Sequence, residues 1–175
     1  MFYGNNCNKI GTKIESFNKL LSDLKPSIFG LEETKLKVND PPIKCENLIN
    51  YQTFELRREK ETENGGKGLE GGGLAIGALH SLRPVLTRQG DDDAECLSIV
   101  VKTIPMDVLC VIGYGPQSGD SIDRKSNFWK YLEKETETAR EHDFGLIIQI
   151  DSNTYYLKTQ INKMQMANSY NSSCN

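Results

Sequence analysis

Two polar residues follow an apolar segment in "LIIQIDSN", residues 146–153. The aliphatic residues at its start are typical of a buried strand, whereas Asp151 and Asn153 at its end are polar. A carboxylate and a carboxamide this close together can form an ordinary turn. They can also hold a metal ion and a water molecule against a phosphate. The second use would require further polar side chains at the same place.

Three other apolar segments also end in oxygen-bearing side chains. Asn6 and Asn8 lie in "GNNCNKIG", Glu32 and Glu33 follow "SIFGL", and Tyr114 follows "DVLCVIG". Carboxylates and carboxamides suit a hard cation such as Mg²⁺, which keeps several waters and is shared with substrate phosphate. Tyrosine and asparagine can hydrogen-bond phosphate oxygens, and an aspartate can orient or deprotonate a water. Together the residue types predict metal-assisted hydrolysis of a phosphodiester.

Each of these residues also has an ordinary structural interpretation. Asparagines such as Asn6 and Asn8 commonly shape turns, and "DSN" is itself a common turn tripeptide. A glutamate after a strand is usually a surface residue, which is the interpretation we adopt for Glu32. Tyr114, next to a glycine and a proline, could pack within a turn. The occurrence of all four segments in order favours function.

The elements that would position these side chains follow an α/β pattern. Thr12 and Glu15 in "TKIE" predict a capping box at the start of a helix that Pro26 ends. A second amphipathic helix is predicted over residues 122–141. Strands are predicted at "SIFGL" and over residues 51–56, 74–77, 96–101, 107–113 and 144–150. Helices near both ends with strands between them indicate an α/β fold.

Composition limits the class of protein. The chain has 175 residues, of which 37% are hydrophobic and 26% charged, so a globular protein is expected. We expect one domain over residues 1–153 and a polar, disordered tail over residues 154–175. The net charge of −3 argues against a protein that binds nucleic acid non-specifically, although it permits a local basic rim.

Cysteine usage and targeting signals bear on location. The five cysteines are widely spaced and include no CxxC motif, which argues against structural zinc and against a disulfide framework. No apolar run approaches the roughly 20 residues that span a bilayer, and no secretory signal precedes the first segment. We therefore expect an intracellular protein, nuclear or cytoplasmic, that is not membrane-bound.

In order along the chain, these motifs resemble those of the endonuclease/exonuclease/phosphatase superfamily, and most closely the apurinic-endonuclease-like domains of non-LTR retrotransposons. "NNCNKIGTK" resembles the Asn-x-Asn-Gly opening of the family, and "LEETK" resembles its Leu-Gln-Glu-Thr-Lys. "GGGLAIG" resembles its glycine-led strand, while "GYGPQ" and "IIQIDSN" resemble its Tyr-containing and Asp-x-Asn segments. The resemblance, over residues 4–153, implies a partial four-layered α/β sandwich of the DNase I-like type. Mostly the first half of that fold is expected, with mixed strands and two amphipathic helices.

Matched by position, the resemblance assigns roles to five residues. It implies that Glu33 binds the metal and that Asn6 supports it. It further implies that Tyr114 positions the phosphate, Asp151 activates the attacking water, and Asn153 steadies the charge that develops on the phosphate.

The resemblance also implies the partners of the site. It marks Glu95 and Asn8 as supporting residues. The expected cofactor is Mg²⁺, with Mn²⁺ as an alternative, and no small-molecule cofactor is expected. The expected substrate is DNA.

The chain departs from the family pattern at several positions. Lys9 and Ile150 stand where the family usually has glycine, and neither His80 nor His142 matches the Ser-Asp-His segment with which the family ends. We therefore expect a truncated domain. A sandwich that lacks strands leaves an apolar sheet face in water, so self-association through this incomplete sheet is a further expectation.

Three hypotheses follow for function. The leading one is a Mg²⁺-dependent endonuclease domain that nicks DNA and derives from a retrotransposon reading frame, incomplete in this chain. The second is a catalytically inactive truncated relic, and the third is a phosphomonoesterase or inositol phosphatase of the same superfamily.

Overall fold

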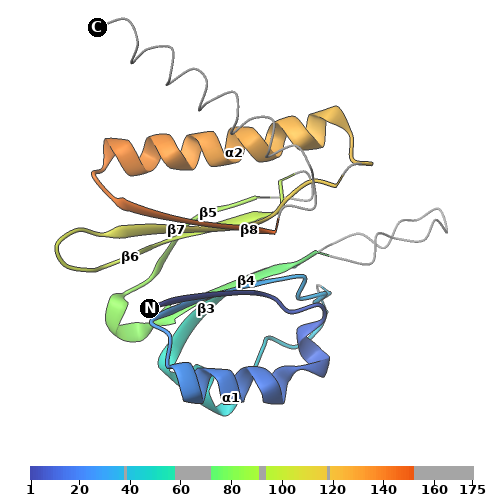
Figure 1. Cartoon of the computed structure of the whole chain (residues 1–175), viewed down its shortest axis with the longest axis vertical. Coiled ribbons are helices and arrows are strands. Elements are labelled where there is room, and N and C mark those ends of the chain that lie inside the picture. Colours follow the sequence, from blue (N-terminus) through green and yellow to red (C-terminus); the bar gives the residue numbers. More distant parts are fainter. Residues whose placement is uncertain (38, 58–71, 91–93, 118, 152–175) are drawn as a thin grey trace, which may run out of the picture.

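The chain folds into four layers in a computed structural model, which describes residues 1–37, 39–57, 72–90, 94–117 and 119–151. Helix α1 (Ile14–Leu24) covers one four-stranded sheet, and helix α2 (Ile122–Glu141) covers a second one. The two sheets pack face to face between the helices (Figure 1). This arrangement confirms the predicted α/β sandwich; the predicted tail, 154–175, lies outside the described residues.

The first sheet contains β1 (Phe2–Asn6), β2 (Ile28–Glu32), β3 (Tyr51–Leu56) and β4 (Leu74–Leu79) in the order β1-β2-β4-β3. Strands β1 and β2 are parallel, and the other pairs are antiparallel. Short 3₁₀ helices lie at Ile10–Thr12 and Glu46–Asn50. A third, His80–Leu82, leads from β4 to the second sheet.

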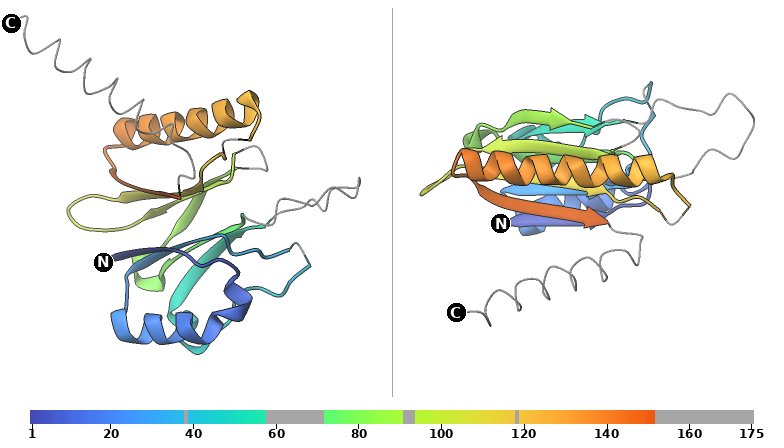
Figure 2. Two further views of the ribbon diagram at one scale, coloured as in Figure 1. Left: turned by 45° about the vertical axis from the view of Figure 1, so that its right-hand side comes forward. Right: turned by 90° about the horizontal axis from the view of Figure 1, so that it is seen from above.

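The second sheet contains β5 (Val85–Gln89), β6 (Cys96–Val101), β7 (Val108–Tyr114) and β8 (Gly145–Asp151) in that order. Strands β7 and β8 are parallel and are joined through α2, whereas the other pairs are antiparallel. Seen from above, α2 runs along the outer face of this sheet (Figure 2).

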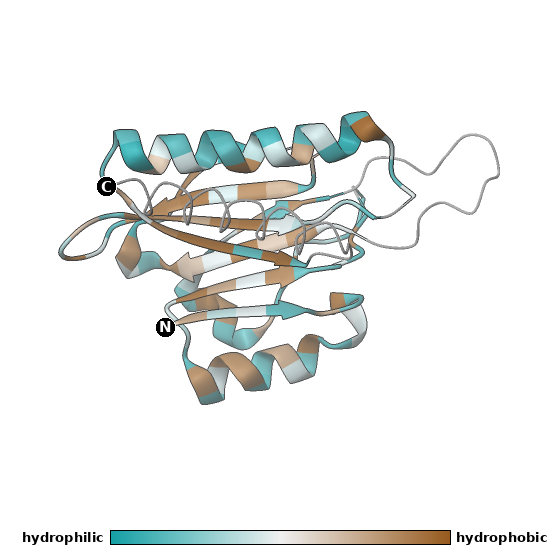
Figure 3. Ribbon diagram, turned by 45° about the horizontal axis from the view of Figure 1, so that its top comes forward, coloured by the Kyte–Doolittle hydropathy of each residue, from teal (hydrophilic) through white to brown (hydrophobic). Residues whose placement is uncertain are grey.

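Three apolar clusters hold the layers together. The cluster between the sheets includes Ile76, Ile99 and Ile112, all without measurable exposure. Phe17 and Phe29 belong to the cluster between α1 and the first sheet. The cluster under α2 contains Phe128 and other apolar residues, while the opposite face of this helix is hydrophilic (Figure 3). Neither helix of the described residues has the length and apolarity needed to cross a bilayer.

The start of α1 differs from the predicted capping box. The helix begins at Ile14 after Lys13, and no side chain caps it. Thr12 directly precedes Lys13 and lies within a 3₁₀ turn, where its hydroxyl donates to the Lys9 carbonyl oxygen at 3.0 Å. The left-handed conformation of Lys9 starts this turn, so the chain is already coiled where the capping box was expected. The predicted bounds of α2 are confirmed, and Ser121 caps it by accepting a hydrogen bond from the Arg124 backbone N–H at 3.1 Å.

The two sheets are in close contact where Gly4 and Gly30 pair. The side chain of Gln149, on β8, lies against both glycines: a Cβ added at Gly4 would be 2.0 Å from the Gln149 Oε1. Strands β1 and β8 are edge strands of their sheets, and the contact between Gln149 and Gly4 places them on the same side of the sandwich. On β8, Leu146 and Ile148 are 36% and 41% exposed. Self-association through this side stays a prediction.

We expect Gly30→Ala to lower the free energy of unfolding by about 1–3 kcal/mol, the usual cost of overpacking a core. A Cβ at this position would lie 2.7 Å from Ile112 Cγ2 and from Gln149 Oε1, so these side chains or the sheets that carry them would have to move. Chemical denaturation measures the change. Gly11→Ala is the control because no atom lies within 4 Å of its added Cβ. Equal stability of the two variants would contradict the close approach of the sheets.

Candidate active site at the strand ends

Four polar side chains lie at the carboxyl ends of strands. Asn6, Tyr114 and Asp151 are the last residues of β1, β7 and β8, and Glu33 directly follows β2. Parallel pairing of β1 with β2, and of β7 with β8, places the ends of each pair at one edge of its sheet. The sequence predicted polar residues at these ends.

Two hydrogen bonds join these ends across the sandwich. The Asn6 side-chain amide donates to the Asp151 carboxylate. The Tyr114 hydroxyl donates to Glu33 Oε1 at 2.9 Å. In addition, Tyr114 and Asp151 are register partners in the second sheet. The structure thus brings Asn6, Glu33, Tyr114 and Asp151 together, whereas Asn153 lies outside the described residues.

The backbone at Glu33 is held in an uncommon conformation. Its φ of 53° falls in the left-handed region, which residues other than glycine seldom adopt. Two backbone hydrogen bonds hold it: the Glu33 carbonyl accepts from the Lys9 N–H at 2.8 Å, and the Thr34 N–H donates to the Gly73 carbonyl at 3.1 Å. Such conformations persist where surrounding contacts fix them, and they cluster at functional sites.

Asn6 both shapes a turn and contacts another residue of the candidate site. Its side-chain oxygen accepts a hydrogen bond from the Asn8 backbone N–H at 3.1 Å, which is the hydrogen bond of an Asx turn. Its amide nitrogen at the same time donates to Asp151. Asn8 therefore supports Asn6 through its backbone, and the turn fixes the direction of the Asn6 amide.

Tyr114 is 4% exposed and has a second partner that the sequence analysis did not identify. The Gln117 side-chain amide donates to the Tyr114 hydroxyl at 3.0 Å. Burial raises the pKa of Tyr114, and its hydrogen bond to Glu33 acts in the same direction. The hydroxyl therefore stays protonated at neutral pH and remains a donor. Gln117 belongs to the "GYGPQ" segment, so its closeness in sequence was the only available signal.

Glu95 has partners on two other elements. Its Oε1 accepts from Arg124 Nη2 at 2.8 Å, and its Oε2 accepts from the Gly73 N–H at 3.1 Å. Its backbone carbonyl accepts from the Tyr114 N–H at 2.9 Å. Glu95 thus links the first turn of α2 to the strand that carries Tyr114. Arg124, which also pairs with Asp120 at 3.2 Å, was not singled out from the sequence.

The surface interpretation of Glu32 is wrong. Glu32 is only 3% exposed, and the other four residues of β2 are buried as well. Burial, reinforced by the nearby Asp151 carboxylate, raises the pKa of Glu32 to about 7, against an opposing hydrogen bond from Gln149. Its Oε1 has no hydrogen-bond partner in the described structure. The single sequence gave no signal that β8 would cover this residue.

The oxygen donors at this edge are of the type that a hard divalent cation binds. No group of three or more His, Cys, Asp or Glu residues within the described ranges is placed to hold a metal. Mg²⁺ is commonly bound through only one or two carboxylates, however, and completes its octahedron with waters and substrate phosphate. Glu33 supplies a carboxylate next to the Tyr114 hydroxyl, and the Asn6 and Asp151 side chains supply further oxygens. The donor set suits a hard cation and offers neither sulfur nor imidazole.

We expect Glu32→Gln to stabilise the metal-free protein by at most roughly 3 kcal/mol at pH 8 and by much less at pH 5. The folded-state pKa of about 7 is above the ordinary 4.5, so the folded protein binds this proton more tightly than the unfolded chain. The wild type therefore loses stability as pH rises from about 4.5 to about 7, and the glutamine variant lacks that loss. Denaturation in EDTA at both pH values measures it. A stability difference independent of pH would contradict the shifted pKa.

Neither the models of known protein families nor the sequences of curated proteins match this chain. Solved structures do match. A 3′ phosphatase, NExo, from Neisseria bound to a product DNA hairpin aligns with a TM-score of 0.60 and 18% identity, over 87% of this chain and 56% of that one. TDP2 from D. rerio, complexed with a single-strand DNA product, aligns with a TM-score of 0.56 and 10% identity, over 87% and 59%.

The endonuclease domain of TRAS1, a telomere-specific non-LTR retrotransposon, aligns with a TM-score of 0.51 and 16% identity, over 86% of this chain and 59% of that one. This chain thus spans a little more than half the length of each of the three structures. At these identities the likeness shows the fold. The described residues adopt the DNase I-like α/β sandwich fold of these structures, the fold that the order of the motifs predicted.

Proposed function

We propose that the chain carries the site of a divalent-metal-dependent phosphodiesterase that cleaves the backbone of DNA. The observation that carries this proposal is the pair of hydrogen bonds across the sandwich, Asn6 to Asp151 and Tyr114 to Glu33. They gather a carboxamide, two carboxylates and a phenol from four strands at one edge. Structural packing alone does not require such a collection of polar groups on four separate strand ends.

The metal site in this proposal is built on Glu33. Its carboxylate would hold Mg²⁺, or Mn²⁺, with help from the Asn6 oxygen. When bound, the ion would neutralise charge on the phosphate. The Tyr114 hydroxyl, kept protonated and oriented by Gln117, positions a phosphate oxygen.

The nucleophile in this proposal is a water molecule that Asp151 orients. The Asn6 amide fixes the direction of the Asp151 carboxylate and leaves it able to accept the proton that the water loses. Asn153, two residues later in the sequence, would donate to the oxygen on which charge develops. The chemistry then depends on positioning and on charge stabilisation, as phosphoryl transfer generally does.

The matched structures support nucleic acid as the substrate. Two of them contain DNA products, and the third is an endonuclease domain of a retrotransposon. The retrotransposon structure is named an endonuclease domain, which favours cleavage within a strand, in agreement with the spacing of the motifs. A second candidate is removal of a terminal phosphate from DNA, because the Neisseria protein is named a 3′ phosphatase.

A catalytically inactive chain is the third candidate, and the placement of the histidines favours it. His80 follows the end of β4, and β4 runs antiparallel to β2. His142 follows the last residue of α2, before β8 begins. Both histidines of the chain therefore lie at the opposite end of the strands from Asp151. A missing acid–base group typically lowers a rate by roughly 10²–10⁴-fold.

The purified protein should nick supercoiled plasmid in Mg²⁺, and EDTA should stop the reaction. Glu33→Gln should lower the rate at least about 100-fold, because the amide removes the charge that holds the metal. Gel conversion of supercoiled to open-circular plasmid measures it. Glu137→Gln is the control, since Glu137 is exposed on α2.

Three outcomes of that experiment would change the assignment. Nicking that persists in Glu33→Gln would show that the metal site is wrongly placed. Release of inorganic phosphate from 3′-phosphorylated DNA, without nicking, would assign the phosphatase activity. A folded protein without either activity would be the inactive relic.

We further expect Tyr114→Phe to lower the single-turnover rate of nicking by about 10–100-fold while the protein remains folded. The change removes only the hydroxyl that contacts Glu33 and Gln117, and the ring remains packed between the sheets. Single-turnover nicking measures the loss. Tyr51→Phe is a matched control because the Tyr51 hydroxyl bonds the Pro26 carbonyl beside α1. An unchanged rate in Tyr114→Phe would remove this hydroxyl from the proposed site.

A further inference from the structure

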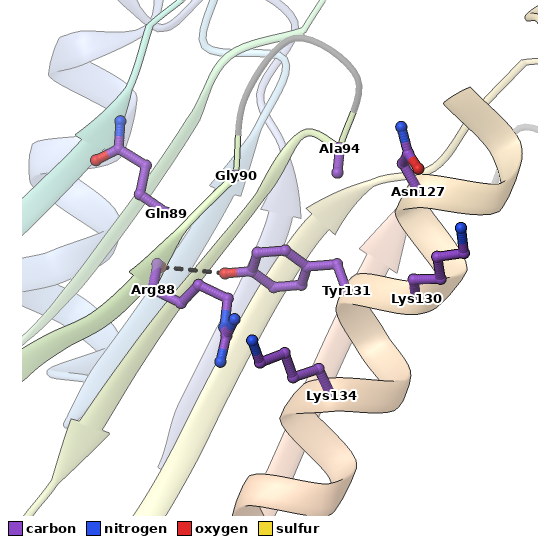
Figure 4. A pocket seen from close by; sticks show the side chains of 8 residues that line it. All are labelled: Arg88, Gln89, Gly90, Ala94, Asn127, Lys130, Tyr131 and Lys134. Atoms are coloured by element: carbon purple, nitrogen blue, oxygen red, sulfur yellow. Dashed lines mark hydrogen bonds between the residues drawn. The ribbon is translucent and has the colours of Figure 1, made fainter. Parts of the chain in front are cut away.

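An open hollow of about 390 Å³ lies on the outer face of the second sheet, between β5 and α2 (Figure 4). It is lined by Arg88, Gln89, Gly90, Ala94, Asn127, Lys130, Tyr131 and Lys134. We call it the α2 hollow. It lies toward the same end of the strands as the candidate active site: Ala94 directly precedes Glu95, whose carbonyl accepts the Tyr114 N–H.

Three cationic side chains from two different elements line the α2 hollow. Arg88 comes from β5, whereas Lys130 and Lys134 are one turn apart on α2. The Arg88 guanidinium and the Lys134 ammonium group extend toward each other beside the Tyr131 ring (Figure 4). Like charges that converge in this way repel each other, so an anion between them would be stabilised.

The Tyr131 side chain fixes the position of Arg88. The Tyr131 hydroxyl donates to the Arg88 carbonyl oxygen at 3.1 Å and contacts the Ser98 hydroxyl at 2.9 Å. The Arg88 guanidinium carbon lies 5.8 Å from the centre of the Tyr131 ring. Glu135, only 1% exposed, accepts from Arg88 Nε. The guanidinium is therefore held in place, and in the described structure its two terminal nitrogens have no acceptor.

Lys130 and Lys134 have no carboxylate partner among the residues that the structure describes. Some cations of the described structure do have one: Arg124 pairs with Glu95, and Lys102 pairs with Asp107. The Glu135 carboxylate balances the charge of Arg88, so the α2 hollow keeps two positive charges, those of Lys130 and Lys134. Asn127 adds an amide at the rim. This combination of fixed guanidinium, two ammonium groups and an amide suits a phosphate.

We propose that the α2 hollow binds a backbone phosphate of the same nucleic acid strand whose cleavage is proposed above, at a distance from the cleaved bond. This inference rests on the proposed function. A contact to a phosphate carries no sequence information and serves to fix the register and orientation of the substrate. It would give an acidic chain a local site for a polyanion.

The sequence offers one competing use for the two lysines. Asp91, Asp92 and Asp93 follow Gly90, which lines the α2 hollow. If the lysines serve mainly to balance charge within the chain, their removal should change the free energy of unfolding and leave DNA affinity unaltered. The experiment therefore needs both measurements.

The test compares two double variants that remove the same charge. Lys130→Gln with Lys134→Gln changes the α2 hollow, whereas Lys19→Gln with Arg140→Gln changes two exposed cations on α1 and at the end of α2. Affinity for a short fluorescent DNA duplex is measured by anisotropy in EDTA at several salt concentrations. We expect the first pair to weaken binding about tenfold or more and to reduce the salt slope by about 0.9, the value for the loss of one phosphate contact. The second pair should leave the slope nearly unchanged.

Several results would overturn the proposal. One is an equal loss of affinity in both double variants, and another is unaltered affinity in the first. Unaltered DNA affinity with weaker binding of inorganic phosphate, measured by calorimetry, would assign the hollow to a free phosphate compound instead. Because binding is measured in EDTA, loss of affinity in the first pair without any nicking by the wild type would contradict the proposed activity and not the phosphate site. Nicking by the wild type together with an unaltered salt slope in the first pair would contradict the phosphate site and not the proposed activity.

Discussion

The close packing of the two sheets is the constraint on which the candidate site depends. Gly4 and Gly30 lack side chains where the sheets meet, and Gln149 occupies that space. Only at such a short separation can a side chain at the end of one sheet hydrogen-bond a side chain at the end of the other. The bonds from Asn6 to Asp151 and from Tyr114 to Glu33 both cross this interface. A wider gap would separate the residues without changing either sheet.

The outer layer containing α2 is tied to the same interface. Glu95 bonds Tyr114 through its backbone and Arg124 through its side chain, so the first turn of α2 is fixed relative to the strand end that carries Tyr114. Ser98 and Tyr131 fix the helix to the second sheet further along. A substrate that contacted both the site and the α2 hollow would therefore bind a single rigid surface. This arrangement favours pre-organised binding over binding that must first order the protein.

The sequence predicted those parts of the fold that depend on local periodicity. Residues 51–56 and 96–101 are strands, and residues 122–141 are a helix, with the bounds that the pattern indicated. Strand β5 was not predicted, because "VLTRQ" is mostly exposed and owes its conformation to pairing with β6. The prediction of a capping box was wrong for a similar reason. The turn at Lys9 is set by hydrogen bonds to the segment after β2, far along the chain.

The candidate site shows the same division between local and long-range information. The order of the motifs was enough to predict that Asn6, Glu33, Tyr114 and Asp151 belong together, although Asn6 and Asp151 are 145 residues apart. The burial of Glu32 was not predictable, because it depends on how β8 covers β2. Partners such as Gln117 and Arg124 also required coordinates, since a polar residue in a loop or on a helix usually faces solvent.

The charge distribution explains why the site and the α2 hollow need each other in this proposal. Glu32, Glu33 and Asp151 lie close together, and no lysine or arginine of the described structure forms an ion pair with them. This end of the sandwich would repel a phosphate unless a cation were bound there. The net charge of −3 says little about the repulsion at this end, because electrostatic fields at ordinary ionic strength are screened beyond about 10 Å. A metal held at Glu33 would reverse the local sign for one phosphate. The fixed cations of the α2 hollow would offset the repulsion for another, so that an acidic protein could still hold an extended polyanion.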